Sequence, residues 1–371
     1  MSYLGENIPK LGFGLMRLPM IKNEVDIEQT KQMVDLFMQK GFSYFDTAFG
    51  YLNGKSEEAA KTALVDRYPR EQFQLATKLP AWIGAKNAEE AKNMFWISLK
   101  RTNAEYFDFY LLHNLGGKRT EVFEKFGIWD FLAEQKEKGK IKHLGFSSHA
   151  KAEQLDEILT KHPEAEFVQT QINYADWEDD SVEARKCYEV ARKHGKPVIV
   201  MEPVKGGALA KLPEVAAKVF SRENPTVSSA SWALRFAADL EGIITVLSGM
   251  STLEQMKDNI SVMEHFKPLT EHERSVIKEV QTILASIPHV PCTDCQYCLK
   301  ACPNNIAIPG ILGTVNDYLI YNDLARSRGL YGWETLVTKA SDCIACKACE
   351  EVCPQNIPIA NELSKAAKLF E

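Results

Sequence analysis

Apolar and polar positions along residues 42–262 follow two recurring patterns that differ in length. Short apolar runs, typical of buried strands, alternate with longer segments that have the 3.6-residue period of an amphipathic helix. Strands are predicted at Phe42–Thr47, Phe73–Lys78, Phe107–His113, His143–Ser147, Phe167–Asn173, Pro197–Glu202 and Ile243–Ser248. Helices are predicted at Asp26–Gln39, Ser56–Asp66, Ala88–Lys100, Thr120–Lys138, Lys151–Lys161, Val182–His194, Thr226–Asp239 and Thr252–Val262.

Strands that alternate with helices of this length indicate βαβ units and a parallel sheet. Seven strands within about 210 residues suit a closed (β/α)8 TIM barrel of the α/β class better than an open doubly wound sheet. We expect the eighth strand between Val204 and Trp232, where no clear period is visible. The segment Ile8–Pro19 is expected to form a small β-hairpin. No G-x-G-x-x-G follows any strand, which disfavours a Rossmann fold.

Eight of the nine cysteines lie in two short runs near the carboxyl end of the sequence. Both runs have the pattern C-x2-C-x2-C-x3-C-P, which is the ligand pattern of bacterial ferredoxins, where the fourth cysteine of each run serves the other cluster. Two [4Fe–4S] clusters are therefore predicted. The expected ligands of one are Cys292, Cys295, Cys298 and Cys353, and those of the other are Cys302, Cys343, Cys346 and Cys349.

Zinc and disulfides are the alternatives for these cysteines. Zinc sites usually come as C-x2-C pairs without a fixed fourth Cys-Pro. Disulfides are rare in a reducing compartment, which the lack of a signal-peptide pattern at the start of the sequence indicates. The ninth cysteine, Cys187, lies in a predicted helix and is expected to be a small buried hydrophobe.

The cysteine runs set the predicted domain organisation. A helix expected at Glu271–Ala285 leads into Ile287–Pro291, whose prolines mark a boundary. We expect a barrel domain over residues 1–285 and a small, mostly helical two-cluster ferredoxin-like domain over residues 286–371. Helices are predicted within it at Asn316–Ala325 and Trp333–Ala340.

Composition narrows the class of protein further. The chain has 371 residues, 45% of them hydrophobic, and a net charge of −6. That charge gives no general reason to expect nucleic acid as a partner. No run of eighteen apolar residues suggests a membrane span. A cytoplasmic protein without membrane or nucleic-acid partners is expected.

Polar residues stand at the carboxyl ends of most predicted strands, where barrel proteins gather their function. They are Asp46, Lys78, His113, Ser147, Gln171, Glu202 and Ser248, and Tyr51 follows Asp46 by five residues. A phenol titrates near pH 10, and a neighbouring ammonium such as Lys78 should lower its pKa. Tyr51 could then protonate a carbonyl oxygen as hydride reaches the carbon, with His113 positioning the same oxygen.

Four segments resemble the aldo/keto reductase family: Leu11–Arg17, Phe45–Tyr51, Ala76–Lys78 and Leu111–His113. The resemblance implies a (β/α)8 barrel that uses NADPH, with a tyrosine acid, a supporting lysine and aspartate, and a histidine that orients substrate. Those roles fall on Tyr51, Lys78, Asp46 and His113. With its cysteine runs, the whole chain is similar to the iron–sulfur-containing members of that family.

The resemblance also implies cofactor contacts. Ser147, Ser148 and Gln171 match positions that hold the nicotinamide amide, and Met201 stands where many members stack a tyrosine on the ring. The segment Leu247–Asn259, including Ser248, matches the adenosine-phosphate segment. Gly249 and Gln255 replace frequent family cations there, so NADP(H) is less favoured over NAD(H) than usual. The missing aromatic leaves room for a flavin such as FMN.

Two functional hypotheses follow. In the first, the barrel moves hydride between a nicotinamide and a small carbonyl or alcohol substrate, and the clusters exchange electrons with a redox partner protein. Because hydride carries two electrons and a cluster takes one, direct coupling needs a converter such as a flavin. In the second, the clusters are structural or serve docking. A binding scaffold is less favoured because all four polar positions are present. Substrate selectivity is expected in the loops Leu115–Arg119 and Trp177–Asp180.

Overall fold

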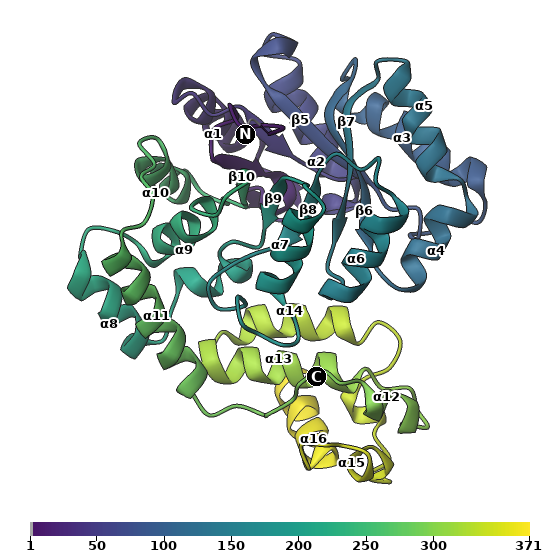
Figure 1. The fold of residues 1–371 in the computed structure, drawn as a ribbon, viewed down its shortest axis with the longest axis vertical. Helices are drawn as coiled ribbons and strands as arrows, with labels where there is room; N and C mark the ends of the chain where they lie inside the picture. The colour runs from purple at the N-terminus through teal and green to yellow at the C-terminus, as the bar shows by residue number, and fades with distance from the viewer. Residues whose placement is uncertain (1–2) are drawn as a thin grey trace. The chain divides into compact units, whose positions relative to one another are not determined.

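A computed structural model describes residues 3–371 of the protein (Figure 1). It contains a closed barrel of eight parallel strands, as the hydrophobic pattern predicts. The chain divides into two compact units. The first consists of the residues up to Gly206 together with Ala230–Glu271, and the second of Gly207–Ser229 together with His272–Glu371. The domain boundary after residue 285 stays a prediction.

The barrel closes in the strand order β1-β10-β9-β8-β7-β6-β5-β4. Each strand is parallel to its neighbours, so all carboxyl ends meet at one end of the barrel. The strands are β1 Leu11–Gly14, β4 Tyr44–Asp46, β5 Gln74–Leu79, β6 Phe107–Leu115, β7 Ile141–Ser148, β8 Val168–Gln171, β9 Val198–Met201 and β10 Ile243–Ser248.

The eighth strand is β1, and its predicted position between Val204 and Trp232 is wrong. Leu11–Gly14 pairs with both β10 and β4, while residues 207–229 contain a 3-10 turn and helix α8 (Glu214–Glu223). Two glycines in four residues hide the strand from pattern analysis. A Cβ on Gly12 would lie 2.8 Å from Leu247 Cδ2, so the close approach of β10 requires glycine there. The hairpin is β2 Met20–Ile21 with β3 Glu24–Val25, further along than predicted.

Helices alternate with the strands as expected. In the first unit they are α1 Ile27–Gln39, α2 Lys55–Ala60, α3 Ala88–Thr102, α4 Lys118–Lys125, α5 Ile128–Glu137, α6 Ala152–Lys161, α7 Ala184–Lys193, α9 Ser229–Ala238 and α10 Leu253–Met263. The helix predicted over Thr120–Lys138 is two helices, because Gly127 has a φ of +58° that an α-helix cannot include. Side-chain caps open several of them, as where Thr252 accepts the N–H of Gln255 at the start of α10.

Among residues 3–371, the buried side chains of the barrel unit include two hydrophobic sets. One large set, which includes Phe13, Phe37 and Phe45, packs the helices onto the strands. A separate set of buried residues consists of Tyr44, Ala76, Phe109, Leu111, Phe167, Ile199, Ile244 and Leu247. Because alternate residues of a strand point the same way, Asp46, Lys78 and His113 lie on the same face as this second set, one step nearer the carboxyl ends.

The second unit is mostly helical, as predicted. Besides α8 it contains α11 Glu271–Ser286, α12 Tyr297–Ala301, α13 Ile308–Tyr321, α14 Leu324–Glu334, α15 Ala348–Glu351 and α16 Ile359–Phe370. Two predicted helices are wrong in detail. Asn322, with a φ of +51°, separates α13 from α14, and the chain is not helical over residues 335–339. Ile308, Leu312 and Leu363 pack there with the buried cysteines. Among residues 3–371, no helix is long and apolar enough to cross a membrane.

Candidate active site

The four polar residues that the sequence selects come together at the carboxyl end of the barrel. Asp46 ends β4, Lys78 is the penultimate residue of β5, and His113 lies near the end of β6, so three adjacent strands supply them. Tyr51 begins the 3-10 turn Tyr51–Gly54 that follows β4. The rings of Tyr51 and His113 stand edge to face with centroids 5.8 Å apart.

Lys78 is the centre of this group. Its ammonium donates to Asp46 Oδ1 at 2.5 Å and to the carbonyl oxygen of Thr47 at 2.7 Å. The same Nζ atom lies 4.9 Å from the centroid of the Tyr51 ring. The exposed fractions of the Lys78 and Asp46 side chains are 0% and 3%. A charged lysine survives such burial only beside a counter-ion, which Asp46 supplies.

The loop that carries Tyr51 is held in an uncommon conformation. Leu52 and Asn53 have φ values of +51° and +57°, which non-glycine residues rarely adopt. Arg101 from α3 stabilises the loop by donating to the carbonyl oxygen of Phe49 at 3.0 Å. Its guanidinium also fills the space where a Cβ of Gly54 would lie. The fold therefore fixes Tyr51 against Lys78 at a cost in backbone strain, as functional loops often do.

Burial shifts the pKa values of the ionisable groups in different directions. Burial alone would lower the pKa of Lys78, but Asp46 and Tyr51 together raise it above its ordinary value, so the ammonium stays charged. Burial raises the pKa of Asp46, and Lys78 opposes that rise. The pKa of His113 lies well below its ordinary value because of burial, with Lys78 acting in the same direction. His113 is therefore neutral near pH 7 and can donate a single hydrogen bond.

The net shift in the pKa of Tyr51 differs from the one expected from the sequence. Lys78 lowers the pKa of the phenol, as expected, but burial raises it by more, so the pKa lies above its ordinary value. Tyr51 is thus a protonated phenol across the neutral range. Near it, two buried polar atoms have no hydrogen-bond partner within residues 3–371, His113 Nδ1 and Asp46 Oδ2. Both atoms keep a hydrogen-bonding capacity that no group within residues 3–371 uses.

The predicted nicotinamide contacts lie on β7, β8 and β9. Ser147 Oγ accepts the backbone N–H of Asn114 at 2.9 Å, and Ser148 Oγ donates to the carbonyl oxygen of Leu115 at 2.9 Å. Both serines are buried and already bonded within the barrel. Met201 ends β9, and its sulfur accepts from Gln169 at 3.8 Å. Gln171 ends β8 and is partly exposed.

Gln171 belongs to a buried polar network that the sequence did not reveal. Its Nε2 donates to Asp176 Oδ2 at 2.7 Å, and Asn173 Nδ2 donates to the same oxygen at 2.6 Å. Lys205 forms an ion pair with the other carboxylate oxygen. Burial would raise the pKa of Asp176, but Lys205 and the amide donors lower it. Because a carboxylate only accepts, the Gln171 amide must turn its NH2 toward Asp176 and its oxygen away.

The predicted adenosine-phosphate segment lies at the end of β10 and the start of α10. Ser248 Oγ accepts from Asn259 Nδ2 at 2.9 Å, and Gln255 Oε1 accepts the N–H of Ser251 at 2.7 Å. Gly249 packs against the side chain of Arg17, where an added Cβ would lie 3.3 Å from Arg17 Cδ. Arg17, whose guanidinium is 3.7 Å from Glu202, therefore places a cation beside this segment.

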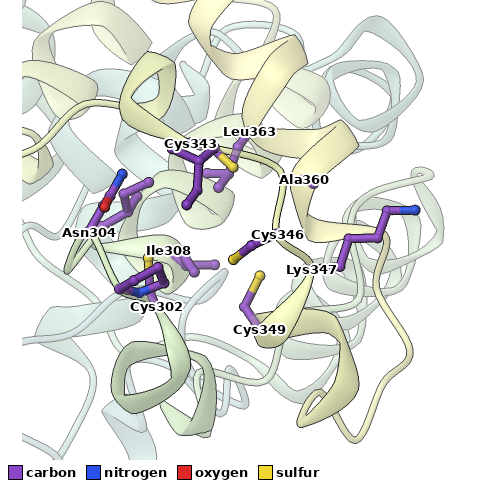
Figure 2. A pocket seen from close by; sticks show the side chains of 12 residues that line it. Cys302, Asn304, Ile308, Cys343, Cys346, Lys347, Cys349, Ala360 and Leu363 are labelled. Carbon is purple, nitrogen blue, oxygen red and sulfur yellow. The ribbon is translucent and has the colours of Figure 1, made fainter.

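The cysteines gather in two groups that exchange their fourth members. A cavity of about 330 Å³ is lined by Cys302 with Cys343, Cys346 and Cys349 (Figure 2). A second cavity, of about 320 Å³, is lined by Cys292, Cys295 and Cys298 together with Cys353. This is the grouping expected from the ferredoxin pattern. Four thiols around an apolar cavity suit a cluster with four corner irons.

The spacing within each group differs from that of a site for a single ion. Among residues 3–371, no three Cys, His, Asp or Glu side chains approach closely enough to ligate one metal ion. A tetrahedral zinc site would need sulfurs about 2.3 Å from a shared centre. Each group offers four thiols, the number of protein ligands that a [4Fe–4S] cluster takes. Burial raises the pKa of the Cys298 thiol to about 11, so ligation there has to displace a proton.

A barrel with these ionisable groups at one end, in a chain with ferredoxin-type cysteine groups, places the protein in the class of oxidoreductases. The chain belongs to the aldo/keto reductase family, whose model matches residues 10–282. A second model, described as a 4Fe-4S dicluster domain, matches residues 291–357. The resemblance seen in the sequence is thereby confirmed for both parts.

Curated relatives are distant. An uncharacterized oxidoreductase, YqkF, from Bacillus subtilis is 24% identical over 305 residues, 74% of this chain and 92% of the relative. An aldo-keto reductase from Mycolicibacterium smegmatis is 28% identical over 144 residues, 39% of this chain, and the alignment spans about half (47%) of that relative.

Solved structures show the same fold. An aldo-keto reductase from Bacillus halodurans in its holo form matches with a TM-score of 0.60 and 24% identity over 75% of this chain and 95% of that one. An aldo-keto reductase from Klebsiella pneumoniae in complex with NADPH matches with a TM-score of 0.57 and 19% identity, covering 74% and 91%.

Proposed function

We propose that the protein reduces a small carbonyl compound, or oxidises the corresponding alcohol, with a nicotinamide dinucleotide bound at the carboxyl end of the barrel. The observation that carries this proposal is the buried Lys78, which bonds Asp46 and lies over the ring of Tyr51 beside His113. A structural ion pair alone would not need a phenol and a neutral imidazole at the same point. Together they can bind and protonate a carbonyl oxygen.

Each residue has a role in this proposal. Tyr51 holds the proton and gives it to the carbonyl oxygen during reduction. Lys78 stabilises the phenolate that remains, because its ammonium lies next to the ring, and Asp46 keeps Lys78 charged and oriented. Neutral His113 donates a hydrogen bond to the same oxygen and so fixes the substrate. A reduced nicotinamide, when bound, supplies the hydride.

The cofactor fits the remaining residues. Gln171, with its carbonyl oxygen turned away from Asp176, can accept from the nicotinamide amide, beside Ser147, Ser148 and Met201. Ser248, Asn259 and the start of α10 can take phosphate. Arg17 beside Gly249 partly offsets the cations missing at Gly249 and Gln255. We therefore propose NADP(H), with NAD(H) as the alternative, which comparative titration of the two dinucleotides distinguishes.

The carboxyl-terminal cysteines are proposed to hold two [4Fe–4S] clusters in the exchanged grouping. Such clusters accept or release one electron each. We propose that they exchange electrons with a redox partner protein, and that FMN is required only if those electrons reach the nicotinamide. The alternative, a structural or docking role, is supported by the burial of Cys298 and Cys349 in the hydrophobic core of their unit.

Replacement of Tyr51 by Phe tests the proposal. The Tyr51→Phe variant lacks only the proton donor, so kcat for reduction of an aromatic aldehyde should fall about 10²- to 10⁴-fold. Dinucleotide affinity, circular dichroism and iron content should not change. Tyr188→Phe is the matched control, since that phenol donates to the Glu241 carbonyl on the surface and should be dispensable. Turnover retained by Tyr51→Phe would show that the acid is wrongly assigned.

A further inference from the structure

Arg119 is a partly buried arginine that no acidic side chain neutralises within residues 3–371. Its Nε donates to the carbonyl oxygen of Asn114 at 2.9 Å, and no carboxylate and no further acceptor bonds its two Nη groups. Most other arginines of the barrel unit form ion pairs, such as Arg70 with Asp108 and Arg101 with Glu57. A half-buried guanidinium without an anion has lost part of its hydration without compensation, which suggests that a ligand supplies the anion.

The turn after β6 holds Arg119 next to the proposed catalytic residues. Asn114, with a φ of +60°, and Gly116, with a φ of +147°, bend the chain back at the end of the strand. A Cβ on Gly116 would lie 3.1 Å from Ala150 Cβ, so the turn packs tightly against the loop after β7. Asn114, whose carbonyl oxygen anchors Arg119, directly follows His113. Arg119 is thus fixed, and it faces the end of β6.

Trp82 connects Arg119 to His113 directly. Its indole N–H donates to the carbonyl oxygen of His113 at 2.8 Å, and the Arg119 guanidinium carbon lies 5.7 Å from the centroid of its ring. The three residues are therefore neighbours at the carboxyl end of β6. Burial lowers the pKa of Arg119, yet a guanidinium remains charged under any physiological condition. The Arg119 cation and the apolar Trp82 ring thus lie side by side, next to the backbone of His113.

Strand order separates this cation from the proposed cofactor phosphates. In the closed order, β6 is four strands from β10 in either direction, so Arg119 lies across the barrel from Ser248 and α10. A dinucleotide whose phosphates lie at β10 and whose nicotinamide lies beside Tyr51, Lys78 and His113 approaches β6 only with its nicotinamide end. The Arg119 side of the mouth is left for the substrate.

We propose that the substrate is an aldehyde or ketone that also bears a carboxylate, and that Arg119 binds this carboxylate while Tyr51 and His113 hold the carbonyl oxygen. This inference rests on the proposed reduction and names its substrate class. The apolar part of the substrate packs on Trp82. Arg119 is in this account a specificity residue that acts through binding.

Paired probes test this inference, 4-carboxybenzaldehyde against its methyl ester. The wild-type protein should prefer the acid, and Arg119→Gln should raise KM for the acid about 10- to 100-fold while leaving kcat/KM for the ester within about threefold. Arg119→Lys should recover part of the preference. Arg328→Gln, which removes the same charge from the second unit, should leave both substrates unaffected. Equal turnover of acid and ester by the wild type, or equal losses for both in Arg119→Gln, would overturn the inference.

Binding is measured separately from turnover. The same two compounds are titrated against the dinucleotide-saturated protein by intrinsic tryptophan fluorescence. The acid should bind at least tenfold more tightly than the ester, and Arg119→Gln should abolish the difference. If the acid binds selectively but no aldehyde is reduced, the carboxylate site stands and the proposed reduction fails. If the wild type binds both alike, the carboxylate site fails whatever the activity.

Discussion

Lys78, Tyr51 and His113 share one desolvated space, and burial affects each according to the charge it carries. The lysine keeps its charge because Asp46 lies 2.5 Å away, whereas the phenol and the imidazole are driven toward their neutral forms. The proposed reduction uses these neutral forms, in which the phenol would give the proton and the imidazole N–H would position the oxygen.

The pH dependence of the reduction follows from these shifts. The active form of Tyr51 is its acid, which is lost as the pH rises through a pKa above the ordinary 10.0. His113 stays neutral above a pKa that lies below the ordinary 6.5. With saturating substrate, kcat for reduction should therefore be flat between about pH 7 and pH 9 and fall only at higher pH. A fall with a midpoint inside that range would contradict the assigned groups.

Asp176 is expected to orient Gln171 for nicotinamide. The Asp176→Asn variant replaces an obligate acceptor by a group that can face either way, so the Gln171 amide loses its fixed direction. We expect the Kd of the complete dinucleotide to rise about tenfold and that of the matching ADP-ribose fragment, which lacks nicotinamide, to stay constant.

Fluorescence titration of both ligands measures this difference. Asp180→Asn, an exposed carboxylate in the same connection, serves as the control and should bind both ligands normally. Equal weakening of dinucleotide and fragment by Asp176→Asn would mean that Asp176 only supports the fold and does not orient Gln171.

Among the elements, the exchange of fourth cysteines between the two runs is the most specific structural feature of the second unit. Cys353 follows α15 and lines the cavity of the first run, and Cys302 follows α12 and lines that of the second. If these cavities hold the clusters, cysteines grouped in space belong together, even where sequence places them in different runs.

Double variants test that grouping. Cys353→Ser with Cys295→Ser removes two proposed ligands of one cluster, so about half of the iron should remain after anaerobic purification. Cys353→Ser with Cys346→Ser affects both clusters and should leave almost none. Iron and sulfide analysis, with the electron paramagnetic resonance spectrum of the reduced protein, gives the result. The reverse outcome, in which the second pair retains half of the iron, would assign Cys353 to its own run.

The sequence predicted most elements because apolar periodicity is strong in long, regular segments. It failed where single residues interrupt a pattern. Leu11–Gly14 is too short and glycine-rich to show a period, and its pairing with β10 is a contact between distant segments. The positive φ of Gly127 and that of Asn322 divide helices whose patterns looked continuous.

The candidate site was predicted in part for similar reasons. Asp46, Lys78 and His113 stand at the carboxyl ends of strands, which the barrel brings together, and Tyr51 follows one of these strands. The types and the order of these four residues carry the family resemblance. The network of Asp176 and Lys205 and the unpaired Arg119 depend on side-chain geometry after turns, which no periodicity encodes. The net pKa shift of Tyr51 also required knowledge of burial. The sequence indicated that Lys78 lowers the pKa of Tyr51, but it did not indicate that burial raises this pKa by more.

At the scale of the whole molecule, a family that transfers two electrons as hydride is joined to a dicluster domain that handles them singly. The barrel brings together Tyr51, Lys78, Asp46 and His113, the groups that the proposed direct hydride transfer to a carbonyl uses. In the proposed function, reduction takes place in the barrel without an intervening flavin, and the clusters exchange electrons with a partner protein. A flavin relay would instead pass the hydride through a ring nitrogen whose hydrogen exchanges with water.

Anaerobic reduction of 4-carboxybenzaldehyde with NADPH or NADH deuterated at the transferred position of the nicotinamide separates these routes. Mass spectrometry and NMR of the alcohol measure where the deuterium goes, and the denatured protein is assayed for released flavin. Direct transfer predicts one deuterium on the carbinol carbon, no flavin and a large loss of rate in Tyr51→Phe. Alcohol without deuterium, together with flavin released from the protein, would contradict the account.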